Sequence, residues 1–134
     1  MVYKFVDMIS DIAVEIKTSS PEELFIEGAL ALEEIMVDLD FETDMMKTIK
    51  LSAESLDLLF FDWLSELIFI KDTNRLVFNK FSIELNGTQL NATIYGTKIE
   101  NTKEQKADVK AITMHKFKVD KTNDGWYAFV VFDV

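Results

Sequence analysis

Two turn signals in the second half of the chain constrain its fold more than any other feature. Asn86-Gly87 stands between two apolar stretches, and Asn-Gly in that setting is the strongest short-range signal for a β-hairpin. Asn123-Asp124-Gly125 has the same setting with a slightly longer loop. The two signals predict four strands, at Leu76–Leu85, Thr88–Ile99, Asp108–Asp120 and Trp126–Asp133. The last strand is apolar on both faces, so we expect it to be central in its sheet and covered on both sides.

The first half of the chain predicts two helices. Ser20 can cap a helix, Pro21 suits its first position, and Glu23 completes a capping box. This first helix should run to about Met36 and face inward with Leu24, Phe25, Ala31, Leu32, Ile35 and Met36. A second helix is expected from about Leu56 to Ile70, with Ser55 as its cap. Its buried stripe comprises Leu56, Leu59, Phe60, Trp63, Leu67 and Ile70.

Three further strands complete the predicted order of elements. They lie at Val2–Asp7, Asp11–Lys17 and residues 45–52, and apolar side chains alternate along the second of them. The chain shows no internal repeat and no linker, so we expect a single domain over residues 1–134. The resulting order, ββαβαββββ, is typical of a two-layer α+β fold with two helices packed on a mixed, largely antiparallel sheet.

The charge of the chain argues against several kinds of partner. The sequence has 14 Lys and Arg against 24 Asp and Glu, a net charge of −10. Phosphate backbones repel such a protein, so we expect no direct nucleic-acid binding, and a role in RNA metabolism would require a protein partner. The most apolar stretch, Leu56–Ile70, is interrupted by acids, and the N-terminus has no signal-peptide pattern. We therefore expect a cytoplasmic protein without membrane contact, which the absence of cysteine also favours.

Motifs for catalysis are missing from the sequence. It has no Gly-rich phosphate loop, no GxSxG, no HExxH and no cysteine. Strand alternation places the one histidine, His115, on an apolar face with Val109, Ala111, Thr113, Phe117 and Val119. A histidine in that setting favours a structural role. The sequence therefore predicts a protein that is not an enzyme.

Carboxylates gather where the last strand ends. Asp133 and the terminal carboxylate of Val134 follow a strand that should be buried, and buried carboxylates stay ionised together only when a cation or a basic group neutralises them. Asp7 or Asp11, at the ends of the opening strands, would add a third oxygen. Such an oxygen-only cluster suits a hard cation such as calcium or magnesium. A frayed, solvated C-terminus is the alternative interpretation of the same residues.

Several motifs, in order along the chain, resemble those of the archease family. The opening Tyr-Lys-Phe-Val-Asp-Met-Ile-Ser-Asp-Ile is similar to the family's Asp-His-Thr-Ala-Asp-Ile/Val motif. Further matches are Ser-Pro-Glu-Glu-Leu-Phe at 20–25, Ile-Met-Val-Asp at 35–38, Phe-Asp-Trp-Leu-Ser-Glu-Leu at 61–67, Val-Lys-Ala-Ile-Thr at 109–113, Gly-Trp at 125–126 and Val-Val-Phe-Asp-Val at 130–134.

The resemblance implies an accessory function in tRNA splicing. Archeases promote guanylylation and multiple turnover of the RNA-splicing ligase, and some are described as chaperone-like helpers of tRNA-processing or tRNA-modifying enzymes. The family's calcium site corresponds here to Asp11, Asp133 and Val134, so calcium or another divalent cation is the implied cofactor. Asp7 and Lys110 are candidates for a supporting role or for a transient contact with the ligase. Strand alternation places Lys110 on the face opposite His115, where an ordinary solvated lysine is the alternative interpretation.

The sequence departs from the family mainly within the opening motif. Met8, Ile9 and Ser10 replace the usual His, Thr and Ala, while both aspartates remain. Any role of that histidine is therefore lost, and the metal site is expected to persist in weakened form. Leu58, Phe61 and Phe69 support a different hypothesis, a general adaptor that binds apolar surfaces, although they would also suit packing beneath the C-terminal sheet.

Overall fold

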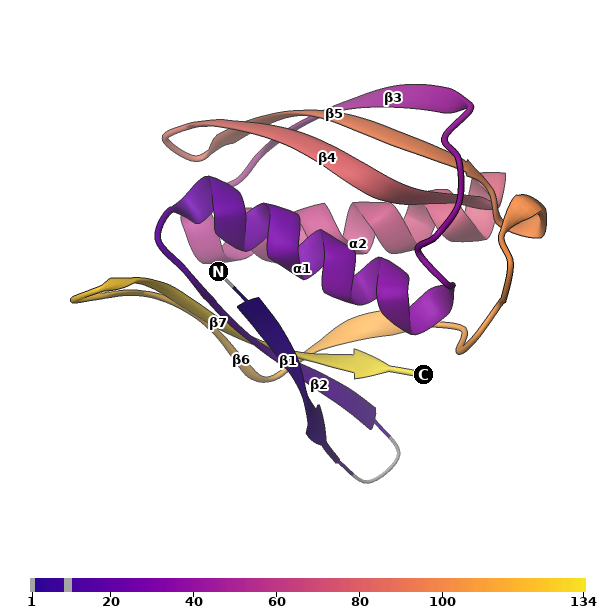
Figure 1. Cartoon of the computed structure of the whole chain (residues 1–134). Coiled ribbons are helices and arrows are strands. Elements are labelled where there is room, and N and C mark those ends of the chain that lie inside the picture. Colours follow the sequence, from indigo (N-terminus) through magenta and orange to yellow (C-terminus); the bar gives the residue numbers. More distant parts are fainter. Residues whose placement is uncertain (1, 9–10) are drawn as a thin grey trace.

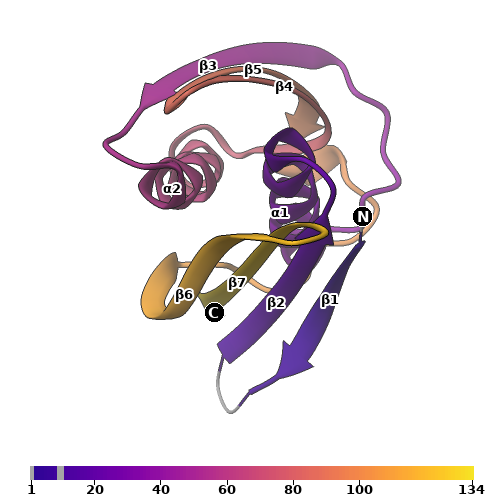
Figure 2. The same ribbon diagram turned by 90° about the vertical axis from the view of Figure 1, so that its left-hand side faces the viewer.

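Two helices lie between two antiparallel β-sheets (Figures 1 and 2). The computed structural model describes residues 2–8 and 11–134, without the side chain of Asp7. The helices are α1 (Pro21–Met36) and α2 (Leu56–Asn74). The expected α+β class and the order ββαβαββββ are confirmed, with a short 3₁₀ helix, η1 (Ile99–Asn101), as an addition.

The seven strands of the described residues divide into a sheet of four and a sheet of three. The four-stranded sheet has the order β1 (Val2–Asp7), β2 (Asp11–Thr18), β7 (Gly125–Asp133), β6 (Ala111–Thr122). The three-stranded sheet has the order β3 (Met45–Ser52), β5 (Gln89–Lys98), β4 (Leu76–Asn86). All pairs are antiparallel, and the predicted hairpins are β4–β5 and β6–β7. As expected, β7 is central in its sheet, although its side chains are fully covered only near its C-terminal end.

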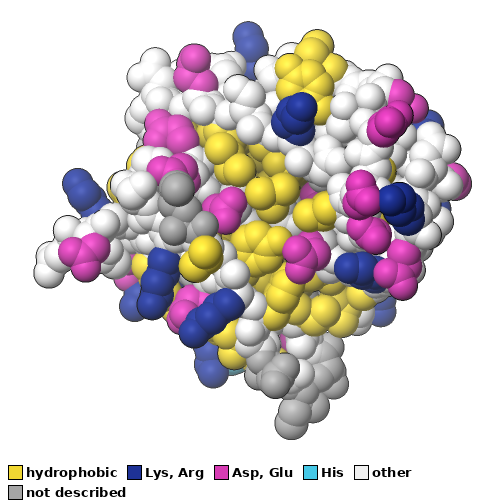
Figure 3. All heavy atoms as spheres, in the orientation of Figure 1, with side chains coloured by type: hydrophobic (Ala, Val, Ile, Leu, Met, Phe, Trp, Pro, Cys, Tyr) yellow, Lys and Arg dark blue, Asp and Glu magenta, His cyan; other side chains and the backbone are white. Residues whose placement is uncertain are grey.

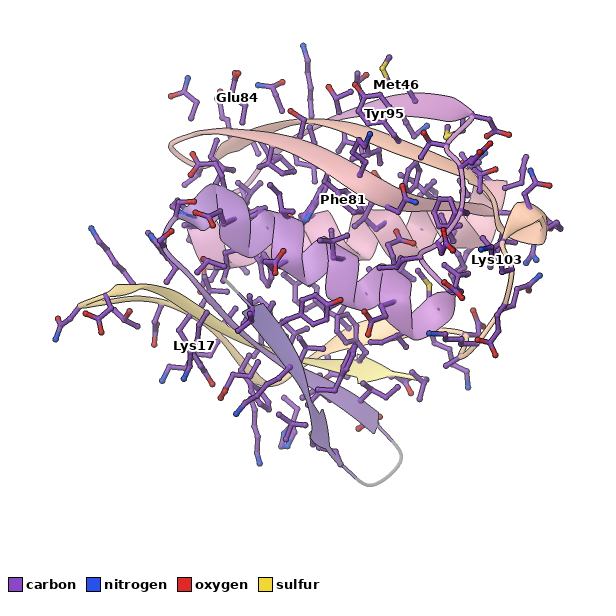
Figure 4. The ribbon with its side chains drawn as sticks, in the orientation of Figure 1. Lys17, Met46, Phe81, Glu84, Tyr95 and Lys103 are labelled. Atoms are coloured by element: carbon purple, nitrogen blue, oxygen red, sulfur yellow. The ribbon has the colours of Figure 1, made fainter. Side chains whose placement is uncertain are left out.

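Apolar side chains on several sides of α2 account for the second sheet. Phe60 stacks near Phe117 of β6, with 6.3 Å between ring centroids, while Trp63 meets Phe81 of β4 edge to face at 6.1 Å. Figure 4 shows Phe81 pointing from β4 toward the helices, and Glu84 of the same strand pointing to the outside. A helix with apolar residues on opposite faces needs cover on both, and one sheet covers only one. The helices therefore form the middle of three layers instead of packing on one mixed sheet.

The start of α1 follows the sequence prediction. The Ser20 hydroxyl accepts the backbone N–H of Glu23 at 3.2 Å, and Pro21 occupies the first turn. The six residues expected to face inward are all buried. In α2, by contrast, Ser55 makes no side-chain cap bond to the backbone, because its hydroxyl donates to Asp57.

Strand β6 departs from simple alternation, so the expected placement of His115 is wrong. Pairing with β7 shifts register between Thr113 and Lys118, and Lys116 within that stretch has φ of 59°. His115 is exposed there, as is Ala111, which was expected on the same apolar face. The strand also begins at Ala111 and not at Asp108. None of the described helices is long and apolar enough to cross a membrane.

Candidate functional site

The sheet register brings together two aspartates that are far apart in sequence. Asp11 opens β2 and Asp133 closes β7, and the two are direct partners across the antiparallel pair. Partners in such a pair point to the same face, with Cβ atoms about 4.5–5.5 Å apart. Alternation along β2 puts Asp11 with Ala13 and Glu15 on the face turned away from the helices, since Val14 and Ile16 belong to the core. The carboxylates therefore share one end of the outer sheet face.

The two carboxylates are more accessible than the sequence suggested. Asp133 is exposed and Val134 is half-buried, whereas we expected the carboxylates of these two residues to be buried, and Asp11 is half-buried. The buried part of β7 ends at Phe132, one residue before Asp133, and Phe132 is 1% exposed. The case for a cation thus rests on repulsion between like charges placed directly opposite each other, which destabilises a sheet, and not on burial.

Backbone hydrogen bonds fix the position of Asp133. The Lys110 N–H donates to the Asp133 carbonyl at 2.8 Å, which joins the start of β6 to the end of β7. The predicted site residue Lys110 therefore lies beside Asp133 through its backbone. The remaining predicted ligand, Val134, follows Asp133 and is half-buried.

A buried lysine anchors the segment that carries Lys110. Lys71 of α2 is 3% exposed, and its ammonium donates to the Val109 carbonyl at 3.0 Å and to Asp108. Burial by itself would lower the pKa of Lys71, but the hydrogen bonds and charges of Asp108 and Asp72 raise it overall. These bonds explain why β6 begins only at Ala111. Sequence reasoning missed Lys71, because one lysine near the end of an apolar helix is read as a solvated C-terminal charge.

The donors at this end of the sheet match a hard cation in kind but are few in number. Carboxylate and backbone oxygens are the ligands that calcium and magnesium take, and calcium takes six to eight of them. Within the described part of the chain, no group of three or more Asp, Glu, His or Cys residues could hold a metal ion. Asp11 and Asp133 would thus be two protein ligands, with backbone oxygen and water as the natural remainder. The Asp7 side chain, Ile9 and Ser10 lie outside the described residues.

A shallow groove beside Lys110 contains Phe61 and Phe69, two of the three apolar residues on which the adaptor hypothesis rests. Its volume is about 360 Å³, and Lys110 lines it together with Phe61, Ile68, Phe69 and Ile112. Phe61 is half-buried and packs edge to face on Phe117, as expected for packing beneath the sheet. Phe69 is 60% exposed and Leu58 is 36% exposed, so these two remain on the surface.

Comparisons with known proteins place the chain in a family. It matches the Archease protein family over residues 3–134. Relatives named archease include one from Archaeoglobus fulgidus, 32% identical over 140 residues covering 100% of both chains, and one from Pyrococcus abyssi, 35% identical over 132 residues and 93% of both.

Solved structures agree with this match. A solution structure of a protein from Methanobacterium thermoautotrophicum covers 98% of both chains at 30% identity, with a TM-score of 0.87. A crystal structure from Thermotoga maritima, described as an archease and possible chaperone, has a TM-score of 0.70 at 26% identity, and the match covers 98% of this chain and 96% of that one. This chain belongs to the archease family.

Proposed function

We propose that this protein is a non-enzymatic activator of the RNA-splicing ligase, and that it promotes ligase guanylylation and multiple turnover from the Asp11–Asp133 end of the sheet. The observation that carries the proposal is the direct cross-strand pairing of these two aspartates. Family membership supports it, because the archease resemblance implies this accessory role. The partner is a cytoplasmic protein bound transiently, and the net charge of −10 argues against direct contact with RNA.

The proposed site works by holding negative charge in one place. Asp11 and Asp133, with a backbone oxygen of Val134, would hold calcium or another divalent cation, which supplies positive charge that neutralises the two carboxylates. The Lys110 N–H keeps the end of β7 in position, and Lys71 keeps the segment before Lys110 in position. This protein would therefore present an ordered acidic surface to the ligase, and its own fold would not rearrange on binding.

Ligation by the ligase of the same organism tests this proposal. We expect the protein to raise multiple-turnover ligation and the amount of guanylylated ligase, and the variant Asp11→Ala to lose both effects. Asp120→Ala is the matched control, because Asp120 is an exposed aspartate at the other end of the same sheet and should retain full stimulation. Unchanged stimulation by folded Asp11→Ala would overturn the role of the acidic site.

Calcium binding can be tested without the ligase. Replacing Asp11 with Asn removes one of two opposed charges, so we expect the calcium-free protein to become more stable by about 0.2–1 kcal/mol. Calcium at 100 times its dissociation constant should stabilise the unmodified protein by about 2.7 kcal/mol and leave the variant nearly unaffected. Thermal melting with calcium or with a chelator measures both effects, and Asp120→Asn should respond to calcium like the unmodified protein. A melting temperature that calcium does not move in the unmodified protein would exclude the cation.

A chaperone-like adaptor for tRNA-processing or tRNA-modifying enzymes is the second candidate function. The observation that favours it is Phe69, which is 60% exposed in the groove beside Lys110. Exposed aromatic side chains in a groove are typical of protein-binding surfaces. Protection of a client enzyme against aggregation, retained by Asp11→Ala and lost by Phe69→Ser, would favour this function. The opposite pattern would favour the activator.

A further inference from the structure

Strand β1 is an edge strand that pairs regularly with its neighbour and carries exposed apolar side chains. It ends the four-stranded sheet, and its six residues pair with β2 without a register shift. The other edge of that sheet, β6, is interrupted by a register shift, and so is β4 in the second sheet. Proteins commonly guard free edges by such irregularities, because an unpaired strand offers its N–H and C=O groups to another chain.

The side chains of β1 distinguish it from the remaining regular edge. Val2 is 65% exposed and Phe5 is 42% exposed. Strand β3 is equally regular, but it carries two lysines, Lys47 and Lys50, and lysines on an edge oppose pairing with another strand. The one lysine of β1, Lys4, lies 3.4 Å from Glu15 of the neighbouring strand β2. Figure 2 shows β1 at the margin of its sheet, with β2 on one side and no described strand on the other. Among the edges of the two sheets in the described residues, β1 is therefore the best suited to accept a further strand.

A groove opens where β1 approaches the proposed acidic site. Its volume is about 470 Å³. Phe5, Met8, Ile12 and Ile35 supply apolar walls, and Asp11, Glu34 and Lys106 supply charged groups. Asp11 lines this groove and also belongs to the Asp11–Asp133 pair. The groove opens on the helix side of the sheet, because Glu34 and Ile35 of α1 line it, whereas the carboxylate pair lies on the outer face of the same sheet end. A chain bound along β1 would therefore reach the end of the sheet that holds the pair.

Helix α1 places negatively charged side chains beside this edge. The Tyr3 hydroxyl of β1 donates to Glu34 of α1 at 2.6 Å. Glu27 precedes Glu34 by seven residues on α1, which is two helical turns, so both acids lie on the same face of the helix. Burial, the hydrogen bond to Glu34 and the charges of Glu34 and Glu27 raise the pKa of Tyr3. Figure 3 shows hydrophobic side chains in a band across this face, with acidic side chains beside them. The surface next to β1 therefore complements a segment that carries both apolar and basic side chains.

We propose that β1 binds an extended segment of the ligase as an added strand, with an apolar side chain in the groove beside Asp11 and basic side chains toward Glu27 and Glu34. In this kind of recognition the main-chain hydrogen bonds supply affinity, and pockets for alternate side chains supply specificity. The inference rests on the proposed function, since it names the surface through which the same partner approaches the acidic site.

Hydrogen exchange of the unmodified protein, alone and with saturating ligase, is the direct test. Added-strand binding would slow exchange of the β1 amides that point away from β2, by about tenfold or more, because no described strand pairs with them in the free protein. The amides of β3 provide an internal control and should exchange at the same rate in both samples. Protection at β3 or at the Phe69 groove without protection at β1 would overturn the inference.

Substitutions test the side-chain contacts. Phe5→Ser and Glu27→Gln should weaken ligase binding, each by about two- to tenfold, as expected for one rim charge or one partly exposed apolar contact. Met46→Ser and Glu84→Gln are matched controls, because Met46 is 57% exposed on β3 and Glu84 is exposed on the outer face of the other sheet. Circular dichroism and thermal melting verify that each variant folds.

The two proposals fail in different ways. If the ligase is stimulated, and Asp11→Ala abolishes stimulation, but β1 exchange is unchanged, the proposed function stands and the added strand is wrong. If folded protein neither binds nor stimulates the ligase, both proposals are wrong. Protection of β1 together with weakened binding by Phe5→Ser and Glu27→Gln supports both.

Discussion

Replacing Trp63 with Ala is expected to lower the free energy of unfolding by about 3–5 kcal/mol, the usual cost of removing a large buried aromatic side chain. Trp63 is fully buried, and its indole N–H donates to the Phe25 carbonyl at 2.9 Å, which ties α2 to α1. Its ring also meets Phe81 of the second sheet. The substitution therefore opens a cavity in the middle layer and leaves a buried carbonyl without its donor.

Urea unfolding followed by fluorescence and circular dichroism measures this cost. Trp63→Phe isolates most of the hydrogen-bond contribution, because it keeps most of the apolar volume and removes the indole N–H; leaving the Phe25 carbonyl without its donor should cost about 1–3 kcal/mol. Phe69→Ala on the same helix is the surface control and should change stability by no more than about 0.5 kcal/mol, since Phe69 is 60% exposed. Similar losses for Trp63→Ala and Phe69→Ala would contradict the placement of α2 between two sheets.

Replacing Glu33 with Gln is expected to make the protein more stable at neutral and alkaline pH and to flatten the pH dependence of its stability. Glu33 of α1 is 0% exposed, and neither carboxyl oxygen has a hydrogen-bond partner among the described residues. Burial raises the pKa of Glu33 well above its ordinary value, and the nearby backbone amide of Phe78 and the charge of Lys71 lower it only in part. The folded protein therefore retains a proton that the unfolded chain releases near pH 4.3.

The sign of the pH effect follows from this difference in bound protons. Below about pH 4 both states hold the proton, and the advantage of the folded state is fully present. Above that pH the unfolded chain ionises first, so stability falls by up to about 1.4 kcal/mol per pH unit until the folded-state pKa of Glu33 is reached. Glutamine at position 33 has no proton to release, and that loss disappears.

Urea unfolding at several pH values between 4 and 9 provides the measurement. The difference in free energy between Glu33→Gln and the unmodified protein should grow in favour of the variant as pH rises. Glu42→Gln is the control, because Glu42 is exposed, and it should follow the unmodified protein at every pH. Parallel curves for Glu33→Gln and the unmodified protein would show that Glu33 is not buried as a neutral acid.

Glu33 also shows where sequence reasoning about the helices stops. The inward face of α1 was predicted from its apolar residues, and all six of them are buried. A glutamate gives no apolar signal, so nothing in the sequence marked Glu33 as part of the core. It is buried because α1, like α2, is covered by a sheet on each side, and that arrangement is a property of the whole fold.

Local chemistry in the sequence determined most of the elements. The Ser20 cap, the hairpin turns and the strand alternation act within a few residues, so the predicted helices and strands agree closely with the structure. The end of α2 was placed four residues too early, because Lys71 and its neighbours read as polar helix-end residues, whereas the helix continues to Asn74 and stops at Arg75 with φ of 58°. His115 was misplaced for a related reason, since a register shift depends on the partner strand.

The candidate site, too, was determined partly by the sequence and partly by the tertiary structure. The sequence by itself singled out Asp11 and Asp133, through their positions at strand ends and their resemblance to a family motif. It did not determine that they would face each other, because that requires β7 to lie between β2 and β6 in one particular register. Pairing across more than 120 residues is selected by the burial of both sheets against the helices, and only the closed tertiary structure contains that information.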